Sequence, residues 1–327
     1  MFKRAILTQA LAAPTHRVPN SVSHSVHHSV SHSALILSTH MALLLRLAAG
    51  CPLRLLHALG AAVGWVLYGL SPRFRKYLRL NLAQAGFDDP ATRRTAIAET
   101  GRAAFELPAI WLRPQAEAAG LVREVDGWRR IEDALVAGKG LILLTPHLGC
   151  WEVSAQYFAQ RHPITVMYSP PKVRALEPLM RAGRTREGMK SVPADVSGVR
   201  SMFRALKRGQ AIGMLPDQVP GSGEGEWVEF FGRPAYTMTL AARLAQASGA
   251  RILVAFAERL PAARGYRIHI EGLPELHAGE SELRRMNRAL EILIRRTPAQ
   301  YLWAYNRYKV PAGVAAPRAK PGALNAR

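Results

Sequence analysis

A histidine and a glutamate stand five residues apart, directly after a short apolar run. Residues 145–152 read Thr-Pro-His-Leu-Gly-Cys-Trp-Glu, and their ionisable side chains include His147 and Glu152. An imidazole can act as a general base when an acceptor fixes the proton on one ring nitrogen and leaves the other nitrogen free. Glu152 is a candidate for that acceptor, the role a carboxylate has in a catalytic triad. We therefore predict a His147–Glu152 dyad that deprotonates an alcohol as the alcohol attacks a thioester.

The segment before this motif must place the two side chains. Residues 141–145, Leu-Ile-Leu-Leu-Thr, read as a buried strand, and ligands gather at the carboxyl ends of strands in α/β sheets. Further strands are expected at 164–168, 211–215, 252–257 and 266–270, and helices at 91–112, 128–137, 151–160, 198–208, 236–247 and 281–296. This alternation predicts an α/β fold with a mixed, largely parallel sheet flanked by helices.

Three more blocks follow the first motif along the chain. Pro-Asp-Gln at 216–218 comes after a predicted strand, Phe-Phe-Gly-Arg-Pro-Ala-Tyr-Thr at 230–237 follows a Gly-rich loop, and Tyr-Leu-Trp-Ala-Tyr-Asn-Arg-Tyr-Lys occupies 301–309. Together with the HxxxxE motif, these blocks resemble the glycerolipid acyltransferases, in particular their lipid A branch, the lauroyl/myristoyl acyltransferases of Gram-negative bacteria. The resemblance extends from about residue 41 to residue 309, in the same order.

The resemblance implies an activity and a set of site residues. It implies transfer of a fatty acyl chain from acyl carrier protein to a hydroxyl or hydroxyacyl group of a lipid A precursor, without a cofactor or metal. The family's catalytic pair falls on His147 and Glu152, and its substrate-binding arginine falls on Arg184 or Arg186. Asp217 and Gln218 are expected at the substrate. The alternative is transfer to a lysophospholipid or another lyso-lipid, from acyl-coenzyme A or acyl carrier protein.

The positive net charge of the chain indicates an anionic partner. The chain has 44 Lys and Arg against 23 Asp and Glu, a net charge of +21. Residues 172–208 hold ten basic and three acidic side chains, and Arg binds phosphate through two parallel hydrogen bonds. A solvated helix face is the plainer interpretation of this excess. A nucleic-acid partner is not expected, because helix-turn-helix, zinc-finger and RNA-binding motifs are missing from the sequence.

The N-terminal part of the sequence indicates that the protein associates with a membrane. Residues 41–72 are expected to form a membrane anchor, either a span or a helix in the interface, since the apolar stretch 55–70 is shorter than the ~20 residues of a full span. The basic residues at 73–79 favour the cytoplasmic face of a bacterial inner membrane. Residues 73–310 are expected to form the acyltransferase domain. A low-complexity leader at 1–40 and a tail at 311–327 are expected to be disordered.

Cysteine chemistry offers one rival mechanism. Of the two cysteines, Cys51 and Cys150, the second lies three residues after His147, so a Cys–His acyl-enzyme is conceivable. The neighbouring acid and the family resemblance favour direct transfer in a ternary complex instead. Asp217 has a plainer interpretation too, as a turn residue after Pro216; the functional one is that it shapes the sugar site or orients an active-site arginine.

Overall fold

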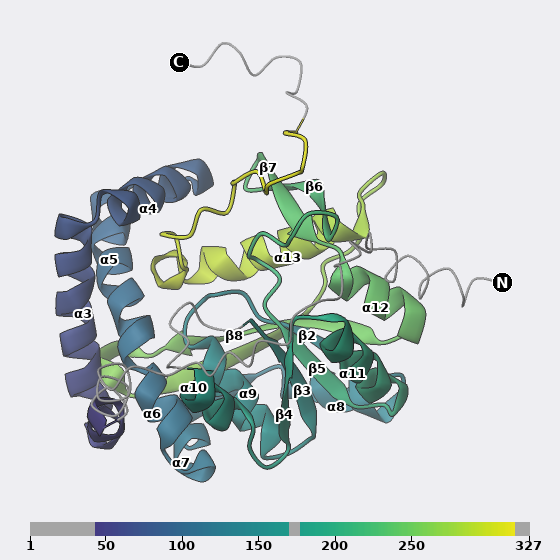
Figure 1. Ribbon diagram of the computed structural model, residues 1–327, viewed down its shortest axis with the longest axis horizontal. Helices are drawn as coiled ribbons and strands as arrows, with labels where there is room; N and C mark the ends of the chain where they lie inside the picture. The colour runs from purple at the N-terminus through teal and green to yellow at the C-terminus, as the bar shows by residue number, and fades with distance from the viewer. Residues whose placement is uncertain (1–42, 170–176, 318–327) are drawn as a thin grey trace, which may run out of the picture.

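A computed structural model describes residues 43–169 and 177–317, so the predicted leader 1–40 and the end of the predicted tail lie outside the described residues. The sheet strands are β1 Val122–Asp126, β2 Leu141–Leu144, β3 Ile164–Tyr168, β4 Met189–Pro193, β5 Ala211–Met214, β8 Arg251–Arg259 and β9 Tyr266–Gly272. They form one sheet in the order β1-β9-β8-β2-β5-β3-β4 (Figure 1). The run from β8 to β4 is parallel, β9 is antiparallel to β8, and β1 is parallel to β9. The predicted mixed, largely parallel sheet is confirmed.

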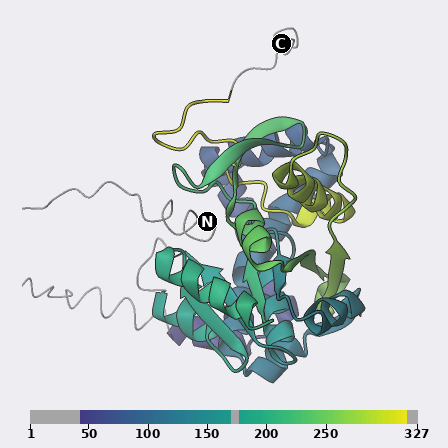
Figure 2. The same ribbon diagram turned by 90° about the vertical axis from the view of Figure 1, so that its right-hand side faces the viewer.

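The central strands have apolar residues on both faces of the sheet, as expected where helices cover both faces. Alternate residues of a strand point to opposite sides, so Ile142 and Leu144 join one buried cluster while Leu141 and Leu143 join the other. One face carries α8 Trp128–Val136 and α9 Trp151–Ala159, and the other carries α11 Val196–Lys207, α12 Leu240–Ser248 and α13 Glu282–Arg296 (Figure 2). Asp195 and Ser281 cap α11 and α13 by accepting hydrogen bonds from backbone N–H groups.

A hairpin stands apart from the main sheet. It consists of β6 Gly225–Phe230 and β7 Arg233–Met238, which pair antiparallel across a turn in which Phe231 and Gly232 have positive φ angles. The helix expected at 236–247 therefore begins too early in the prediction, since residues 236–238 complete β7 and α12 starts at Leu240. Residues 311–317 run past this hairpin, where Trp227 Nε1 donates a hydrogen bond of 2.9 Å to the carbonyl of Ala315.

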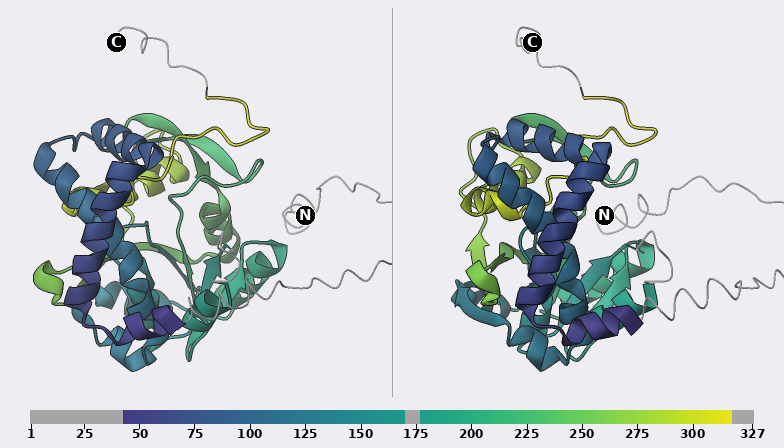
Figure 3. Two further views of the ribbon diagram at one scale, coloured as in Figure 1. Left: turned by 60° about the vertical axis from the view of Figure 1, so that its left-hand side comes forward. Right: turned by 90° about the vertical axis from the view of Figure 1, so that its left-hand side faces the viewer.

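The N-terminal helices form one side of the molecule. They are α3 Leu53–Leu70, α4 Pro72–Ala85, α5 Pro90–Phe105 and α6 Leu107–Leu112, and a shorter helical stretch at 43–50 precedes them. The single helix expected at 91–112 is divided at Glu106, just before Pro108 in the first turn of α6. Among the described helices, α3 alone is long and apolar enough to cross a membrane. It runs beside α5 along the edge of the domain (Figure 3). Two short helices, α7 Gln115–Ala119 and α10 Glu177–Arg184, complete this side.

Candidate active site

The loop between β2 and α9 carries the HxxxxE motif and is held along its length. The carbonyl of His147 accepts a hydrogen bond from Leu302 N at 3.0 Å, and Gly149 N donates to the carbonyl of Gln300 at 3.1 Å. Cys150 N donates to the carbonyl of Ala257 at 2.8 Å. Gly149 has a φ of +60°, and a Cβ there would lie 1.9 Å from the carbonyl oxygen of Ala257. Only glycine fits this position, so the loop follows a path fixed by the end of β8 and the C-terminal segment.

Asp217 holds His147 from the next strand. Its Oδ1 lies 2.8 Å from His147 Nδ1, and its Oδ2 accepts a hydrogen bond of 2.9 Å from the His147 backbone N–H. The two residues follow β2 and β5, which are parallel neighbours, so both side chains emerge at the same edge of the sheet. Burial opposes ionisation of Asp217, but the electrostatic interaction and the hydrogen bonds with His147 outweigh it and hold the pKa of Asp217 below its usual value. The buried Tyr301 hydroxyl beside this carboxylate has a raised pKa. The carboxylate therefore stays ionised and fixes the imidazole.

Gln218 contacts the other ring nitrogen. Its Nε2 lies 3.1 Å from Nε2 of His147. With Nδ1 protonated toward Asp217, Nε2 of the ring has a lone pair that accepts from this amide. His147 is thus held in the tautomer that a general base requires, and its side chain keeps 14% of its surface exposed.

Glu152 has different partners from the predicted one. Its carboxylate accepts hydrogen bonds from Arg184 Nε, at 3.0 Å, and from Arg184 Nη2, and a third of 3.1 Å from Trp111 Nε1. The side chain is buried, which opposes ionisation, but Arg184 and Trp111 lower the pKa of Glu152 below its usual value. The predicted hydrogen bond between His147 and Glu152 is therefore wrong. Both ring nitrogens of His147 have other partners, and the oxygens of Glu152 compensate a buried guanidinium.

The two arginine candidates do not act alike. Arg184, at the end of α10, forms the ion pair with Glu152 and lies over the Trp111 ring at 5.6 Å. Arg186 donates to three backbone carbonyls instead, those of Trp111, of Arg113 at 2.6 Å and of Gly183 at 3.1 Å. The Arg186 guanidinium thus joins segments of the backbone, whereas the Arg184 guanidinium is held by one carboxylate.

A buried ion cluster behind the loop was not found from the sequence. Arg259 makes two hydrogen bonds to Glu106, at 2.9 and 2.6 Å, and one to Glu99 at 3.2 Å. Its Nη2 also donates to the carbonyl of Gly149 at 2.7 Å, and His57 of α3 lies 3.1 Å from Glu106. Burial opposes the charge on Glu106, but Arg259 and His57 lower its pKa to about 2. The available signal was Glu99 and Glu106, which are seven residues apart and so lie on one face of a predicted helix.

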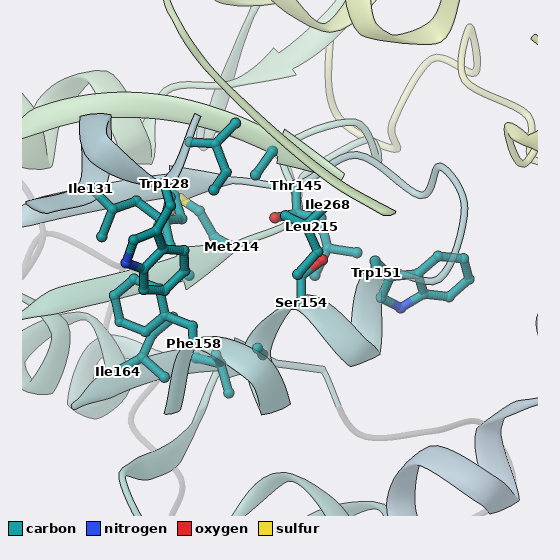
Figure 4. Close-up of a pocket in the computed structure, with 16 residues that line it drawn as sticks. Trp128, Ile131, Thr145, Trp151, Ser154, Phe158, Ile164, Met214, Leu215 and Ile268 are labelled. Atoms are coloured by element: carbon teal, nitrogen blue, oxygen red, sulfur yellow. The ribbon is translucent and has the colours of Figure 1, made fainter. Parts of the chain in front are cut away.

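A cavity lies under the loop. It has a volume of about 60 Å³, and its lining includes Trp128, Trp151, Ser154, Phe158, Ile164 and Met214 (Figure 4). Trp151 also stands beside His147, with the ring centres 4.9 Å apart. The lining is almost entirely apolar, and Trp151 is the lining residue that contacts the imidazole.

The second cysteine is poorly suited to nucleophilic catalysis. Cys150 is buried, and burial together with the nearby Glu106 charge raises the pKa of its thiol well above the usual value. A thiol that resists ionisation is a weak nucleophile. Within residues 43–169 and 177–317, no three His, Cys, Asp or Glu side chains are grouped to hold a metal ion.

Comparison with known proteins identifies the family. Residues 25–310 match the family described as bacterial lipid A biosynthesis acyltransferase. The chain is 27% identical to the lipid A biosynthesis lauroyltransferase of Escherichia coli K12, over 83% of this chain and 90% of that protein. It is 26% identical to the palmitoleoyltransferase of the same organism, over 80% and 88%. A phosphatidylinositol mannoside acyltransferase of Mycobacterium tuberculosis H37Rv is 30% identical, over 46% and 48%. The chain is therefore an acyltransferase that belongs to the bacterial lipid A biosynthesis acyltransferase family.

Proposed function

We propose that the protein transfers a fatty acyl group from the thioester of an acyl carrier protein to a hydroxyl, or to the hydroxyl of a hydroxyacyl chain, of a lipid A precursor. The reaction would take place at the cytoplasmic face of a bacterial inner membrane. The observation that carries this proposal is the imidazole of His147, fixed by Asp217 at the edge of the sheet. The names of the relatives supply the acceptor class.

The geometry supports general-base catalysis by His147. Its Nδ1–H donates to Asp217, and the acceptor hydroxyl replaces the Gln218 amide at Nε2. The hydroxyl oxygen attacks the thioester carbon while its proton passes to Nε2. The carbon–sulfur bond then breaks, and the proton moves from Nε2 to the departing thiolate. A base of this kind contributes roughly 10²- to 10⁴-fold. Asp217 stabilises the imidazolium that forms between the two proton transfers.

In this proposal Glu152 acts through Arg184 instead of through His147. The ion pair with Glu152, in the first turn of α9, holds the guanidinium in one orientation against Trp111. An arginine that is fixed in this way can bind a phosphate group with little loss of side-chain entropy. Glu152 is thus a positioning residue, and Arg184 is the proposed contact for an anionic group of the acceptor.

The apolar cavity is proposed to receive the start of the acyl chain. Its volume of about 60 Å³ is far below the roughly 300–1,000 Å³ of sites that enclose drug-sized ligands. Side chains such as Trp128 and Phe158 must therefore move when a fatty chain enters. Trp151 lines the cavity and its ring stands beside His147, so a chain that passes this ring would bring its carbonyl toward the base.

The reaction is tested with purified protein and defined substrates. Acyl carrier protein and coenzyme A thioesters are supplied as donors, with a lipid A precursor and a lysophospholipid as acceptors, and products are identified by mass spectrometry. We expect an ester of the lipid A precursor, formed faster with the carrier protein, and no product with His147→Ala. Acylation of the lysophospholipid alone would contradict the proposed acceptor. Activity of His147→Ala equal to that of the parent would contradict the mechanism.

The carrier protein is proposed to dock on exposed basic side chains of α10 and α11. Arg181, Arg200 and Arg204 are exposed. Lys207 and Arg208 are exposed too, but they lie where β2 and β5 begin, at the edge of the sheet opposite the candidate site. Acyl carrier proteins are acidic, and complementary charge raises the rate of encounter. Arg200→Glu with Arg204→Glu should raise KM for the carrier-protein donor and leave KM for a pantetheine thioester unchanged. The matched control is Arg129→Glu with Arg130→Glu on α8; an equal rise of KM in the control would contradict this docking site.

A further inference from the structure

Helix α3 is docked onto the domain through small residues on one of its faces. A Cβ on Gly60 would lie 2.7 Å from the carbonyl oxygen of Gly101, and a Cβ on Gly64 would lie 2.3 Å from that of Ile97. The backbones of α3 and α5 are therefore in direct contact along this face. Lipid chains cannot enter between the two helices.

Polar contacts also tie α3 to the centre of the domain. His57, on the same docked face, is buried and lies 3.1 Å from Glu106, which in turn binds Arg259 at the end of β8. Tyr266 of β9 donates to the same carboxylate at 2.9 Å. If α3 crossed a bilayer, α5 and this ion cluster would enter the hydrocarbon with it, at a high cost in desolvation. The helix is one wall of the folded domain.

The opposite face of α3 is apolar and exposed. Leu55, Leu59, Val66 and Leu70 have 47%, 48%, 55% and 79% of their surface exposed. Trp65 and Leu67 lie on this side too, and the helical stretch 43–50 exposes Leu43, Leu44 and Leu47. Figure 3 shows residues 43–50, α3 and α4 together on one side of the molecule. Exposed apolar residues grouped in this way mark an interaction surface; we call these apolar side chains of 43–50 and α3 the α3 face.

The charges around the α3 face have one sign. Residues 43–87 contain no Asp or Glu, whereas Arg46, Arg54, Arg73, Lys76 and Arg79 are exposed. An amphipathic helix with basic residues beside its apolar side is typical of a segment that lies in a membrane interface with anionic lipid. Charge complementarity thus selects an anionic bilayer as the occupant of this face, rather than a second protein.

We propose that the α3 face lies in a single leaflet of an anionic bilayer, with the axis of α3 along the membrane plane, and that α3 does not cross the membrane. The candidate site is close to this surface. Arg113 donates to the carbonyls of Ala49 and Cys51, at the bend between 43–50 and α3, and its own carbonyl accepts from Arg186. A lipid acceptor in the same leaflet would therefore reach Arg184 without leaving the membrane surface.

Depth-dependent quenching tests this orientation on the full-length chain. Leu55→Cys, Ala62→Cys and Leu70→Cys, at the two ends and the middle of the exposed side of α3, are made in a Cys51→Ser background and labelled with an environment-sensitive fluorophore. The labelled proteins are bound to phosphatidylglycerol vesicles that carry a spin label near the headgroup or deep in the acyl chains. Labels at three positions along α3 distinguish a helix that lies flat from one that crosses the bilayer, because only a crossing helix changes its depth in the bilayer along its length.

We expect all three labels to be quenched more by the shallow spin label than by the deep one, to a similar extent. A label at Val136→Cys, an exposed residue of α8, is the control and should not be quenched. Two results would overturn the proposal: no quenching at any of the three positions, or deepest quenching at Ala62 with Leu55 and Leu70 reached by a soluble quencher from opposite sides of the vesicle. The measurement does not depend on catalysis, so it separates this proposal from the proposed function.

Neutral vesicles test the role of charge. In phosphatidylcholine vesicles the shallow quenching of the Leu70→Cys label should fall several-fold, and Arg73→Gln with Lys76→Gln and Arg79→Gln should produce the same loss in phosphatidylglycerol. Equal quenching in both lipids, with and without these substitutions, would contradict anionic lipid as the partner.

Discussion

Asp217→Asn tests most directly which carboxylate serves the base. In the structure Asp217 accepts two hydrogen bonds from His147, at 2.9 Å from the backbone N–H and at 2.8 Å from Nδ1. An asparagine has the same shape but only one accepting oxygen. If that oxygen keeps the backbone N–H, the amide NH₂ faces Nδ1, which must then be unprotonated. The ring proton moves to Nε2, and the lone pair that takes the acceptor's proton is lost.

The size of the effect follows from this change of tautomer. In a Ser-His-Asp triad the same substitution lowers kcat by about 10⁴-fold. We expect kcat of Asp217→Asn to fall by about 10³- to 10⁴-fold, equivalent to roughly 4–5.5 kcal/mol of transition-state stabilisation. KM for both substrates should change little, because the carboxylate is buried behind the imidazole. Steady-state rates measured by mass spectrometry, with donor and acceptor varied in turn, give both constants.

Glu152→Gln is the matched comparison, and it should act through stability. The substitution leaves the Arg184 guanidinium, which is 17% exposed, without its counter-ion. Breaking a buried ion pair from one side costs about 3–5 kcal/mol, so the unfolding temperature should drop. At a temperature where the variant stays folded, we expect kcat well above that of Asp217→Asn and a higher KM for the acceptor. The reasoning would be refuted if Glu152→Gln lost kcat at an unchanged unfolding temperature while Asp217→Asn kept most of its activity.

Three further outcomes follow from the structure. Cys150→Ala should keep most of kcat, because the thiol is buried with a raised pKa; loss of activity in a folded variant would favour an acyl-enzyme. Gly101→Ala should lower stability by about 1–3 kcal/mol, since its Cβ would lie 1.8 Å from the carbonyl oxygen of Gly60, whereas Gly69→Ala meets nothing within 4 Å and should be near neutral in thermal unfolding. The pKa of Glu106 is about 2 in the folded protein against an ordinary 4.5, so its ionisation stabilises the fold fully above pH 4.5 and this stabilisation is lost as the pH falls toward 2. The loss is on the order of 3 kcal/mol, and unfolding midpoints of Glu106→Gln should show a smaller decline over that range.

The sequence predicted the strands that can be recognised from their residue types alone. β2, β3, β5, β8 and β9 are apolar runs in the covered part of the sheet, and their positions were predicted to within a few residues. The edge strands β1 and β4 were missed because two charged or polar residues separate the apolar ones in each, Val122 from Val125 and Met189 from Val192, so the alternation typical of a strand is absent. The last three residues of β7, 236–238, were predicted as the start of a helix, because the turn at Phe231 and Gly232 that sets the direction of β7 depends on backbone angles that residue types do not determine.

The sequence predicted which residues belong to the site, but not which of these residues contact one another. His147 and Asp217 both follow strands, and the sequence placed both at strand ends. It did not give the order of strands in the sheet, and it is the pairing of β2 with β5 that brings Asp217 to Nδ1 of the imidazole. Proximity along the chain favoured Glu152 instead, which the helix α9 directs toward Arg184. Contacts between distant segments, such as Arg259 with Glu106, depend on the tertiary fold in the same way.

The contacts between residues 300–305 and the loop between β2 and α9 have a consequence for folding. Leu302 and Gln300 bind the backbone of this loop, Tyr301 bridges Leu148, and the Tyr305 hydroxyl accepts a hydrogen bond from the N–H of Val219. The loop therefore takes its final path only when this segment, far along the chain, has docked against it. Removal of residues 300–305 should leave the backbone of the HxxxxE motif without these partners.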